Sequence, residues 1–397
     1  MFKRSKTPFG LDVSDISLKI VQFGAGREIA AYSDAAIPKD VVAADIIKDP
    51  KSLISVIREA VAHPQFGRIT SPHVVASIPE TKSFVRVIQM PRMSEEEARE
   101  AVPWEAEQYI PMPIGQVYLD WLILQNNVIG SSAKQSQGDG IATAPTGPRN
   151  DDPSKMTVLI TAAPRDYVDT YVAVLKEAGL RPAALEVESQ ATARSLVSDK
   201  YAREAVLIAD IDTIRTSLII YNKGVLEFTS SLPMAGNVFT EAISKALTID
   251  TASAEKLKRE VGLGDDTPSP TLPTRGREKT KNSSYPLVGE ARRGGEVRKA
   301  LLPVLNNLVG EIKNTMRFHE EHSSPDSKIT RLILAGGSSK LQHLPSWLSE
   351  KLKDTGMKVE LGNPWNKVLG KGQTPPLSRE DSLSYATAIG LALREIE

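Results

Sequence analysis

Two segments of this 397-residue chain place an aspartate at the end of a strand-like run, followed by a polar turn and a second strand. Residues 11–20 contain Asp12, and residues 209–219 contain Asp210. Backbone N–H groups in such turns can converge on anionic oxygens, and Mg²⁺ binds a few carboxylates together with phosphate oxygens. Facing each other across a cleft, the two turns could hold a polyphosphate, with Lys19 neutralising part of its charge. An aspartate before a turn can also serve only to form that turn, so spacing alone leaves both interpretations open.

A third segment suggests how a flat ligand could be approached. Residues 332–335 are apolar and lead directly into Gly336 and Gly337, followed by Ser338. Glycines at this point allow the backbone to come close to a ring system such as adenosine. A double glycine after a strand also occurs as a plain tight loop, and this alternative stays open on the residues alone.

The elements that must position these residues alternate between strand-like and helix-like patterns, which predicts an α/β fold. Each aspartate segment is followed by a glycine-containing turn and a further strand-like run, so each unit has three strands. The two aspartates lie 198 residues apart, which indicates two related halves. Ser94 and Glu97 predict a capping box at the start of a helix that runs to about Tyr109. Apolar residues at helical spacing predict a long helix through 301–316.

Composition excludes several functional classes. The chain is 41% hydrophobic and 25% charged, and 49 Lys and Arg are balanced by 49 Asp and Glu. Zero net charge and 5% aromatic residues argue against a general nucleic-acid binder. The absence of cysteine excludes disulfides, Cys-based metal sites and a Cys nucleophile. No run of 18 apolar residues occurs, and no apolar stretch follows the basic start, so we expect a cytoplasmic protein that reaches a membrane only through a partner.

Two segments, at about 126–155 and 264–295, are rich in loop-forming residues and are predicted to be disordered insertions. Between residues 275 and 299 there are eight Lys and Arg against three Glu. Such a stretch suits either a solvated loop or a contact with anionic lipid or an acidic protein surface. His319 and His322 lack the spacing of a zinc motif, and we predict that they lie on solvated helix surface.

In this order, the three chemical segments resemble the phosphate-1, phosphate-2 and adenosine motifs of the actin-like ATPase superfamily. Within it, the string SFVRVIQMPRMS at 83–94 and the string WEAEQYIP at 104–111 resemble the PilM family of type IV pilus assembly. The resemblance continues through short stretches at 233–237, 254–259, 362–365 and 386–394. Apart from the two insertions, it covers nearly the whole chain.

The resemblance implies a bilobed actin-like ATPase fold with an inserted small domain of the FtsA/PilM type. Lobe 1 would span 1–80 and be completed by 375–397, the small domain would span 81–187, and lobe 2 would span 188–374. The implied function is a cytoplasmic adaptor, peripheral to the inner membrane, that binds the N-terminal cytoplasmic tail of a PilN-like inner-membrane protein. Other components of the pilus machinery and self-association are further implied partners.

Two alternatives to the adaptor remain, an active actin-like ATPase and an FtsA-like cell-division protein. FtsA-like proteins end in an amphipathic membrane helix, whereas this chain stops at Glu397, soon after Gly390. That ending favours the PilM-like interpretation.

Position by position, the resemblance also implies the site. Asp12 and Asp210 would organise Mg²⁺, Lys19 would contact the phosphates of ATP, and Glu188 matches the position that orients the attacking water. The remaining implied nucleotide contacts are Ser14, Thr213, Gly236, Glu255, Lys258, Gly336, Gly337 and Ser338. Without the family context, Glu255 and Lys258 would be interpreted as an exposed helix pair.

The sequence departs from the family at two turn positions. Ser14 and Asp212 stand where relatives usually have glycine. A carboxylate about 4 Å from a phosphate oxygen, at an effective dielectric of about 20, costs about 4 kcal/mol, or about a thousandfold in affinity. We therefore expect at most a weak or degenerate ATPase, with nucleotide as a structural ligand or switch.

Overall fold

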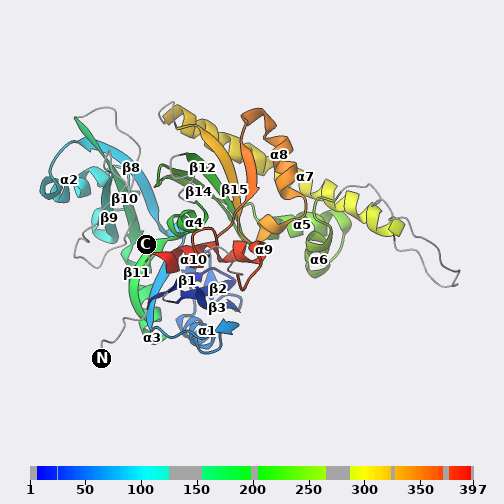
Figure 1. Ribbon diagram of the computed structural model, residues 1–397, viewed down its shortest axis with the longest axis horizontal. Helices are drawn as coiled ribbons and strands as arrows, with labels where there is room; N and C mark the ends of the chain where they lie inside the picture. Colours follow the sequence, from blue (N-terminus) through cyan, green and yellow to red (C-terminus); the bar gives the residue numbers. More distant parts are fainter. Residues whose placement is uncertain are drawn as a thin grey trace.

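The computed structural model describes residues 7–24, 26–124, 154–197, 204–264, 287–322, 327–369 and 375–394. Its two larger sheets lie in two lobes, and a third, smaller sheet extends to one side of them (Figure 1). None of the described helices is long and apolar enough to cross a bilayer.

The first lobe is built on a six-stranded sheet of order β11-β7-β1-β2-β3-β6. Apolar side chains from β1 and β2 pack against two helices on one face of it, and the last helix, α10, packs on the opposite face. Because β1 and β2 are joined by a tight hairpin, Asp12 pairs with Lys19 across the ladder. The elements are β1 (Phe9–Val13), β2 (Ser17–Phe23), β3 (Ile29–Ala36), α1 (Pro50–Ala62), β6 (Phe66–Gly67), β7 (His73–Ile78), α3 (Arg165–Glu177), β11 (Arg181–Val187), α9 (Arg379–Ser382) and α10 (Ala386–Leu393).

The second lobe is built on a five-stranded sheet of order β14-β13-β12-β15-β16. Its first three strands repeat the antiparallel arrangement of β1 to β3, so the predicted duplication is present in the fold. The predicted apolar stripe through 301–316 is buried against this sheet, which confirms the long helix. The elements are α4 (Glu188–Leu196), β12 (Ala205–Ile211), β13 (Thr216–Asn222), β14 (Val225–Leu232), α5 (Gly236–Leu247), α6 (Thr251–Val261), α7 (Leu287–His322), β15 (Ile329–Ala335), α8 (Leu344–Lys351) and β16 (Lys358–Leu361).

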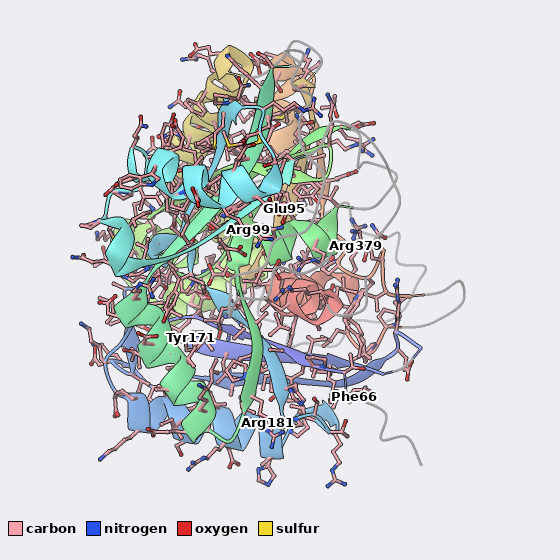
Figure 2. The ribbon with its side chains drawn as sticks, turned by 90° about the vertical axis from the view of Figure 1, so that its left-hand side faces the viewer. Phe66, Glu95, Arg99, Tyr171, Arg181 and Arg379 are labelled. Atoms are coloured by element: carbon pink, nitrogen blue, oxygen red, sulfur yellow. The ribbon has the colours of Figure 1, made fainter. Side chains whose placement is uncertain are left out.

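The smaller sheet has the order β8-β10-β9 and is covered on one face by α2. Its elements are β8 (Phe84–Pro91), α2 (Glu95–Glu107), β9 (Val117–Leu124) and β10 (Lys155–Pro164). The predicted capping box is formed, since the Ser94 hydroxyl accepts a hydrogen bond from the Glu97 N–H and the Glu97 carboxylate accepts one from the Ser94 N–H. In the view of Figure 2, Glu95 and Arg99 pair on the surface of α2, with α3 and its Tyr171 below.

Helices α4 and α10 lie between the two large sheets and pack closely against each other (Figure 1). A Cβ added at Gly390 would stand 1.8 Å from the Ala191 carbonyl oxygen, and one at Gly10 would stand 2.2 Å from the Ala388 carbonyl oxygen. Only glycine fits at these two contacts. The helix pair therefore fixes how closely the lobes approach, and with it the width of any cleft between them.

The structure confirms the prediction of a bilobed α/β fold with an inserted small sheet. The division into domains at 80, 187 and 374 stays a prediction, but residues 165–187 do not lie with the small sheet. Instead, α3 packs in the core of the first lobe and β11 extends its sheet, because their apolar faces are complementary to that core. The predicted insertion at 126–155 lies almost wholly outside the described residues. Most of 264–295 does too, and its last part, from Leu287, begins α7 instead.

The prediction for His319 is wrong. Its side chain is 3% exposed, with Nδ1 3.4 Å from Glu227 Oε2 and Nε2 2.7 Å from the Ser327 carbonyl oxygen. A single helix pattern could not show that β14 covers this side of α7. The side chain of His322 lies outside the described residues.

Candidate functional site

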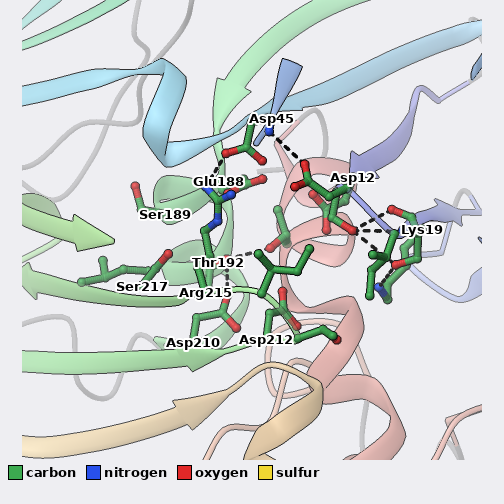
Figure 3. A pocket seen from close by; sticks show the side chains of 18 residues that line it. Asp12, Lys19, Asp45, Glu188, Ser189, Thr192, Asp210, Asp212, Arg215 and Ser217 are labelled. Carbon is green, nitrogen blue, oxygen red and sulfur yellow. Dashed lines mark hydrogen bonds and ion pairs between the residues drawn. The ribbon is translucent and has the colours of Figure 1, made fainter. Parts of the chain in front are cut away.

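The two aspartate-bearing turns line one pocket between the lobes, as Figure 3 shows. One side is formed by the β1–β2 hairpin and the other by the β12–β13 hairpin, with the start of α4 between them. The lining residues are Asp12, Ser14, Asp15, Ile16, Ser17, Lys19, Asp45, Glu188, Ser189, Thr192, Asp210, Asp212, Thr213, Ile214, Arg215, Ser217, Ile219 and Thr387. The pocket thus gathers the residues predicted to contact phosphate and Mg²⁺, and the predicted water-orienting Glu188.

Asp12 lies at the end of β1, where its Oδ1 accepts a hydrogen bond of 2.9 Å from the Ser77 hydroxyl. Burial raises the pKa of its carboxyl group to about 6, although the positive charge of Lys19 opposes the shift. Lys19 follows on β2, and its Nζ donates to the Ser17 hydroxyl at 3.0 Å. Ser14 closes the hairpin, since its N–H and its hydroxyl each donate to the Ser17 carbonyl at 2.9 Å.

Asp210 and Glu188 are acidic groups whose ionised forms are disfavoured, although Lys19 and Arg215 partly oppose the shifts in pKa. Burial raises the pKa of Asp210 well above its usual range, and the charges of Asp212 and Asp12 raise it further. The pKa of Glu188 is also raised well above its usual range by burial and by Asp12. Both shifts indicate a site that would gain free energy from an added cation.

Asp212 lines the pocket, and its side chain is hydrogen-bonded to the loop after β15. Its Oδ1 accepts a hydrogen bond of 3.2 Å from the Gly337 N–H, and its carbonyl accepts one of 2.9 Å from the Ser338 hydroxyl. The second turn is therefore tied to the predicted adenosine loop. Gly336 has a φ of 80°, and a Cβ there would stand 2.6 Å from Asp210 Oδ1, so glycine is required.

Glu255 and Lys258 are brought together, but not as an exposed pair. Lys258 is 8% exposed, and its Nζ contacts Glu255 Oε2 at 2.6 Å and the Gly236 carbonyl and Thr240 hydroxyl at 2.8 Å each. Burial opposes ionisation of Glu255, but hydrogen bonds from Lys258, Thr240 and Arg259 lower its pKa to about 2. These contacts hold α5 against α6 beside the pocket. Six of the predicted nucleotide contacts lie outside the pocket lining, namely Gly236, Glu255, Lys258, Gly336, Gly337 and Ser338.

The cavity itself is small, about 70 Å³. This cavity covers only the phosphate end of the predicted nucleotide site, because the residues predicted to contact the adenosine lie outside its lining. Among the described residues, no three His, Asp or Glu side chains are grouped closely enough to hold a metal ion on their own. The two aspartates Asp12 and Asp210 suit Mg²⁺ whose other ligands are phosphate oxygens and water.

Sequence reasoning missed two pocket residues that form an ion pair, Asp45 and Arg215. Arg215 stands in the second turn, two residues after Thr213, so a search for cations near the turn would have found it. Asp45 lies at the tip of a short hairpin, β4 (Val42–Ala43) and β5 (Ile46–Ile47), and no motif marks it.

Several known proteins resemble this chain in sequence or in fold. The family model of type IV pilus assembly protein PilM matches residues 10–137, 144–273 and 295–396. A solved chain of a PilM-PilN type IV pilus biogenesis complex is 25% identical with a TM-score of 0.73, over 99% of this chain and 100% of that one. The structure of MreB5 of Spiroplasma citri bound to AMPPNP, 13% identical with a TM-score of 0.51, covers 99% of this chain and 97% of its own and shows the fold alone. The predicted actin-like fold is thereby confirmed.

Among curated proteins, the cell division protein FtsA of Neisseria meningitidis is 23% identical over 223 residues. That match covers 55% of this chain and 49% of FtsA. The chain therefore spans about half the length of the curated relatives it matches, while the family match runs through all its lobes.

Proposed function

The chain belongs to the family of type IV pilus assembly protein PilM, and from this premise we propose that it is a cytoplasmic adaptor of pilus assembly. It binds the N-terminal cytoplasmic tail of a PilN-like inner-membrane protein, which brings it to the inner face of that membrane. ATP with Mg²⁺ in the interlobe pocket is its structural ligand or switch. The observation that carries the proposal is the likeness to a chain of the PilM-PilN complex over 99% of this chain.

The small domain offers a place for an extended peptide. β9 lies at the edge of its sheet, and within the described residues no strand pairs with its outer side. Six consecutive residues of β9, from Tyr118 to Ile123, are half-buried, and all but Asp120 are apolar or aromatic. Such an edge can accept an added strand, with main-chain hydrogen bonds giving affinity and side-chain pockets giving specificity.

Polar groups beside this edge favour a peptide over a second folded surface. Burial raises the pKa of Asp120 to about 6, with the charge of Arg394 partly opposing the shift. Nη1 of Arg394 is buried and has no hydrogen-bond partner in the described part of the chain. A buried donor without a partner is costly, so an added acceptor within reach of Nη1 would be stabilising.

The test is a titration of the purified protein with a labelled peptide of the PilN-like tail, followed by fluorescence anisotropy. We expect micromolar binding that falls at least tenfold in Asp120→Arg, because the reversed charge faces Arg394. The control is Glu107→Arg, an equal charge reversal on the exposed surface of α2. Absence of binding at high micromolar protein would refute the adaptor proposal.

An active ATPase is the second candidate, because Glu188 lies in the pocket with Asp12 and Asp210. It predicts Mg²⁺-dependent ATP turnover that Glu188→Gln abolishes while nucleotide binding persists. Turnover that is unaffected by both Glu188→Gln and Asp12→Ala would come from a contaminant. Binding without turnover in the native protein leaves nucleotide in the role of ligand or switch.

A further inference from the structure

One pocket contact has no place in the predicted nucleotide site. Asp45 and Arg215, called the interlobe pair below, form an ion pair that joins the two lobes. The two side chains are 7% and 19% exposed. Figure 3 shows Arg215 directed from the second turn toward Asp45, past Glu188. Transfer of two charged groups from water into a buried site costs free energy. The presence of the interlobe pair in the lining of the pocket therefore needs a physical explanation.

The hairpin that carries Asp45 is held in an uncommon conformation. Ala44 and Asp45 have φ of 50° and 57°, so both central residues of the turn are left-handed, which normally favours glycine or asparagine. The Asp15 carboxylate stabilises this conformation, because it accepts hydrogen bonds of 2.9 Å from the N–H groups of both residues. Asp15 belongs to the first phosphate turn. The tip of the β4–β5 hairpin is thus anchored to one turn and paired with a cation of the other.

Arg215 has the chemistry of a phosphate ligand. A guanidinium donates two parallel hydrogen bonds equally well to a carboxylate or to a phosphate. The lining of the pocket holds two basic side chains, Lys19 and Arg215, against six acidic ones, Asp12, Asp15, Asp45, Glu188, Asp210 and Asp212. A polyphosphate that enters this acidic pocket needs both cations, and Asp45 occupies one of them.

We propose that Arg215 is a phosphate-binding residue of this cleft, that Asp45 takes the place of the phosphate when no nucleotide is bound, and that exchange of one for the other is transmitted to the small domain. This inference rests on the proposed function, since it requires a nucleotide in the pocket.

The contacts around Asp45 supply the route to the small domain. The hydroxyl of Thr81 donates to Asp45, and Thr81 belongs to a single 3₁₀ turn, Glu80–Lys82, that leads directly into β8. Its neighbour Glu80 is bound to the second lobe, because its carboxylate accepts a hydrogen bond from the Thr229 hydroxyl. This turn therefore contacts both lobes at the point where the small sheet begins.

If Arg215 binds a phosphate in place of Asp45, the Asp45 carboxylate is left buried without its cation. Such a charge is strongly unfavourable, so the hairpin tip must move or take up solvent, and its bond to Thr81 changes with it. The result is two arrangements of the same segment, one with nucleotide and one without, which is the physical requirement for coupling two sites. The tail-binding edge of β9 belongs to the sheet that this segment enters.

The first measurement is a calorimetric titration with Mg²⁺ and AMPPNP. We expect Arg215→Gln to weaken binding at least tenfold, because a phosphate contact is lost. We expect Asp45→Asn to tighten binding about threefold to tenfold, because the competing carboxylate is removed. Arg317→Gln, on the exposed surface of α7 and away from the pocket, is the matched control and leaves affinity unchanged. Thermal unfolding of each variant identifies any that fail to fold.

The second measurement is the affinity for the tail peptide with and without Mg²⁺ and AMPPNP. In the native protein the nucleotide shifts tail affinity, whereas in Asp45→Asn the tail still binds and the shift is lost. Thr81→Val, which does not line the pocket, keeps nucleotide affinity within twofold and also loses the shift. Because the chain has no cysteine, a spin-label pair at Lys48→Cys and Lys245→Cys can report the interlobe distance in the same samples.

The outcomes separate the two proposals. If the native protein binds tail and nucleotide but Arg215→Gln binds nucleotide equally well, the role of Arg215 is overturned and the adaptor function stands. If nucleotide does not change the affinity of the native protein for the tail peptide, the proposed transmission from the pocket to the small domain is refuted. If the native protein binds neither ligand, the proposed function fails as a whole.

Discussion

At the scale of single residues, Asp212 decides how well the pocket can bind nucleotide. Sequence reasoning assigned its carboxylate a cost of about a thousandfold, on the assumption of a partly buried charge facing phosphate. The side chain is exposed and accepts a hydrogen bond from the Gly337 N–H, so water screens part of the repulsion, although the charge of Asp212 still raises the pKa of Asp210. At the dielectric of water, a charge pair about 4 Å apart interacts by about 1 kcal/mol.

We therefore predict that Asp212→Gly tightens Mg²⁺-nucleotide binding about fivefold, the equivalent of about 1 kcal/mol, as measured by calorimetry. Asp212→Ala, which removes the same carboxylate without the backbone freedom of glycine, serves as the control for added flexibility. A gain near a thousandfold would mean that the carboxylate turns into the pocket when nucleotide binds.

Asp12 gives nucleotide binding a pH dependence. Burial raises the pKa of its carboxyl group to about 6 in the protein without ligand. Below that pH the group is protonated and cannot hold Mg²⁺; above it, the carboxylate is available. Raising the pH from 5 to 7.5 should therefore tighten Mg²⁺-nucleotide binding about tenfold, since the ionised fraction rises from about one tenth to nearly one. In Asp12→Asn, calorimetry at both pH values should show weak binding with a smaller increase, because Asp210, whose pKa is also raised, still titrates.

The residues of the site were predictable to the extent that they stand in local turns. Asp12 and Asp210 lie in the last two residues of their strands, and the glycines follow β15 directly. A strand followed by a tight turn can be recognised in a few consecutive residues. The interlobe pair could not be predicted, because its partners lie 170 positions apart and depend on how the lobes dock. The same holds for His319, whose burial depends on β14.

At the scale of elements, the contact of α10 with α4 depends on the absence of one side chain. A Cβ at Gly390 would stand 1.8 Å from the carbonyl oxygen and 2.4 Å from the carbonyl carbon of Ala191, both backbone atoms. Gly390→Ala should therefore destabilise the protein by about 3 kcal/mol, since the helices must separate. Urea unfolding, followed by tryptophan fluorescence, measures the change.

A matched helical glycine provides the control. Gly310 lies in α7 with nothing within 4 Å of an added Cβ, so Gly310→Ala should stabilise the helix by about 1 kcal/mol. Equal effects of the two substitutions would show that helix propensity, and not the close approach of α10, dominates at Gly390.

Elements were predicted well wherever one segment carries its own signal. The capping box at Ser94 and the apolar stripe of α7 each depend on neighbouring turns of one helix, and both are confirmed. The sheet to which an element belongs is not a local property. For that reason the sequence did not predict that α3 and β11 join the first lobe.

At the scale of the whole molecule, the two lobes meet closely at the end of the cleft that is predicted to hold the phosphates. The cavity of about 70 Å³ is bounded by the interlobe pair and by the crossing of α4 and α10. A polyphosphate larger than this cavity needs the lobes to open at this point, before or after it binds. Opening of the lobes at the pocket would break the interlobe pair and the hydrogen bond from Thr229 to Glu80.

This geometry predicts the kinetics of binding. In stopped-flow experiments with a fluorescent ATP analogue and Mg²⁺, the observed rate should reach a plateau as ligand concentration rises, because opening of the lobes limits entry. Asp45→Asn should raise the plateau severalfold, since one interlobe contact is removed, whereas Arg317→Gln should leave it unchanged. A rate that increases linearly with ligand concentration up to the diffusion-limited range would show that the pocket is already open in solution, and that the lobes close only after nucleotide has bound.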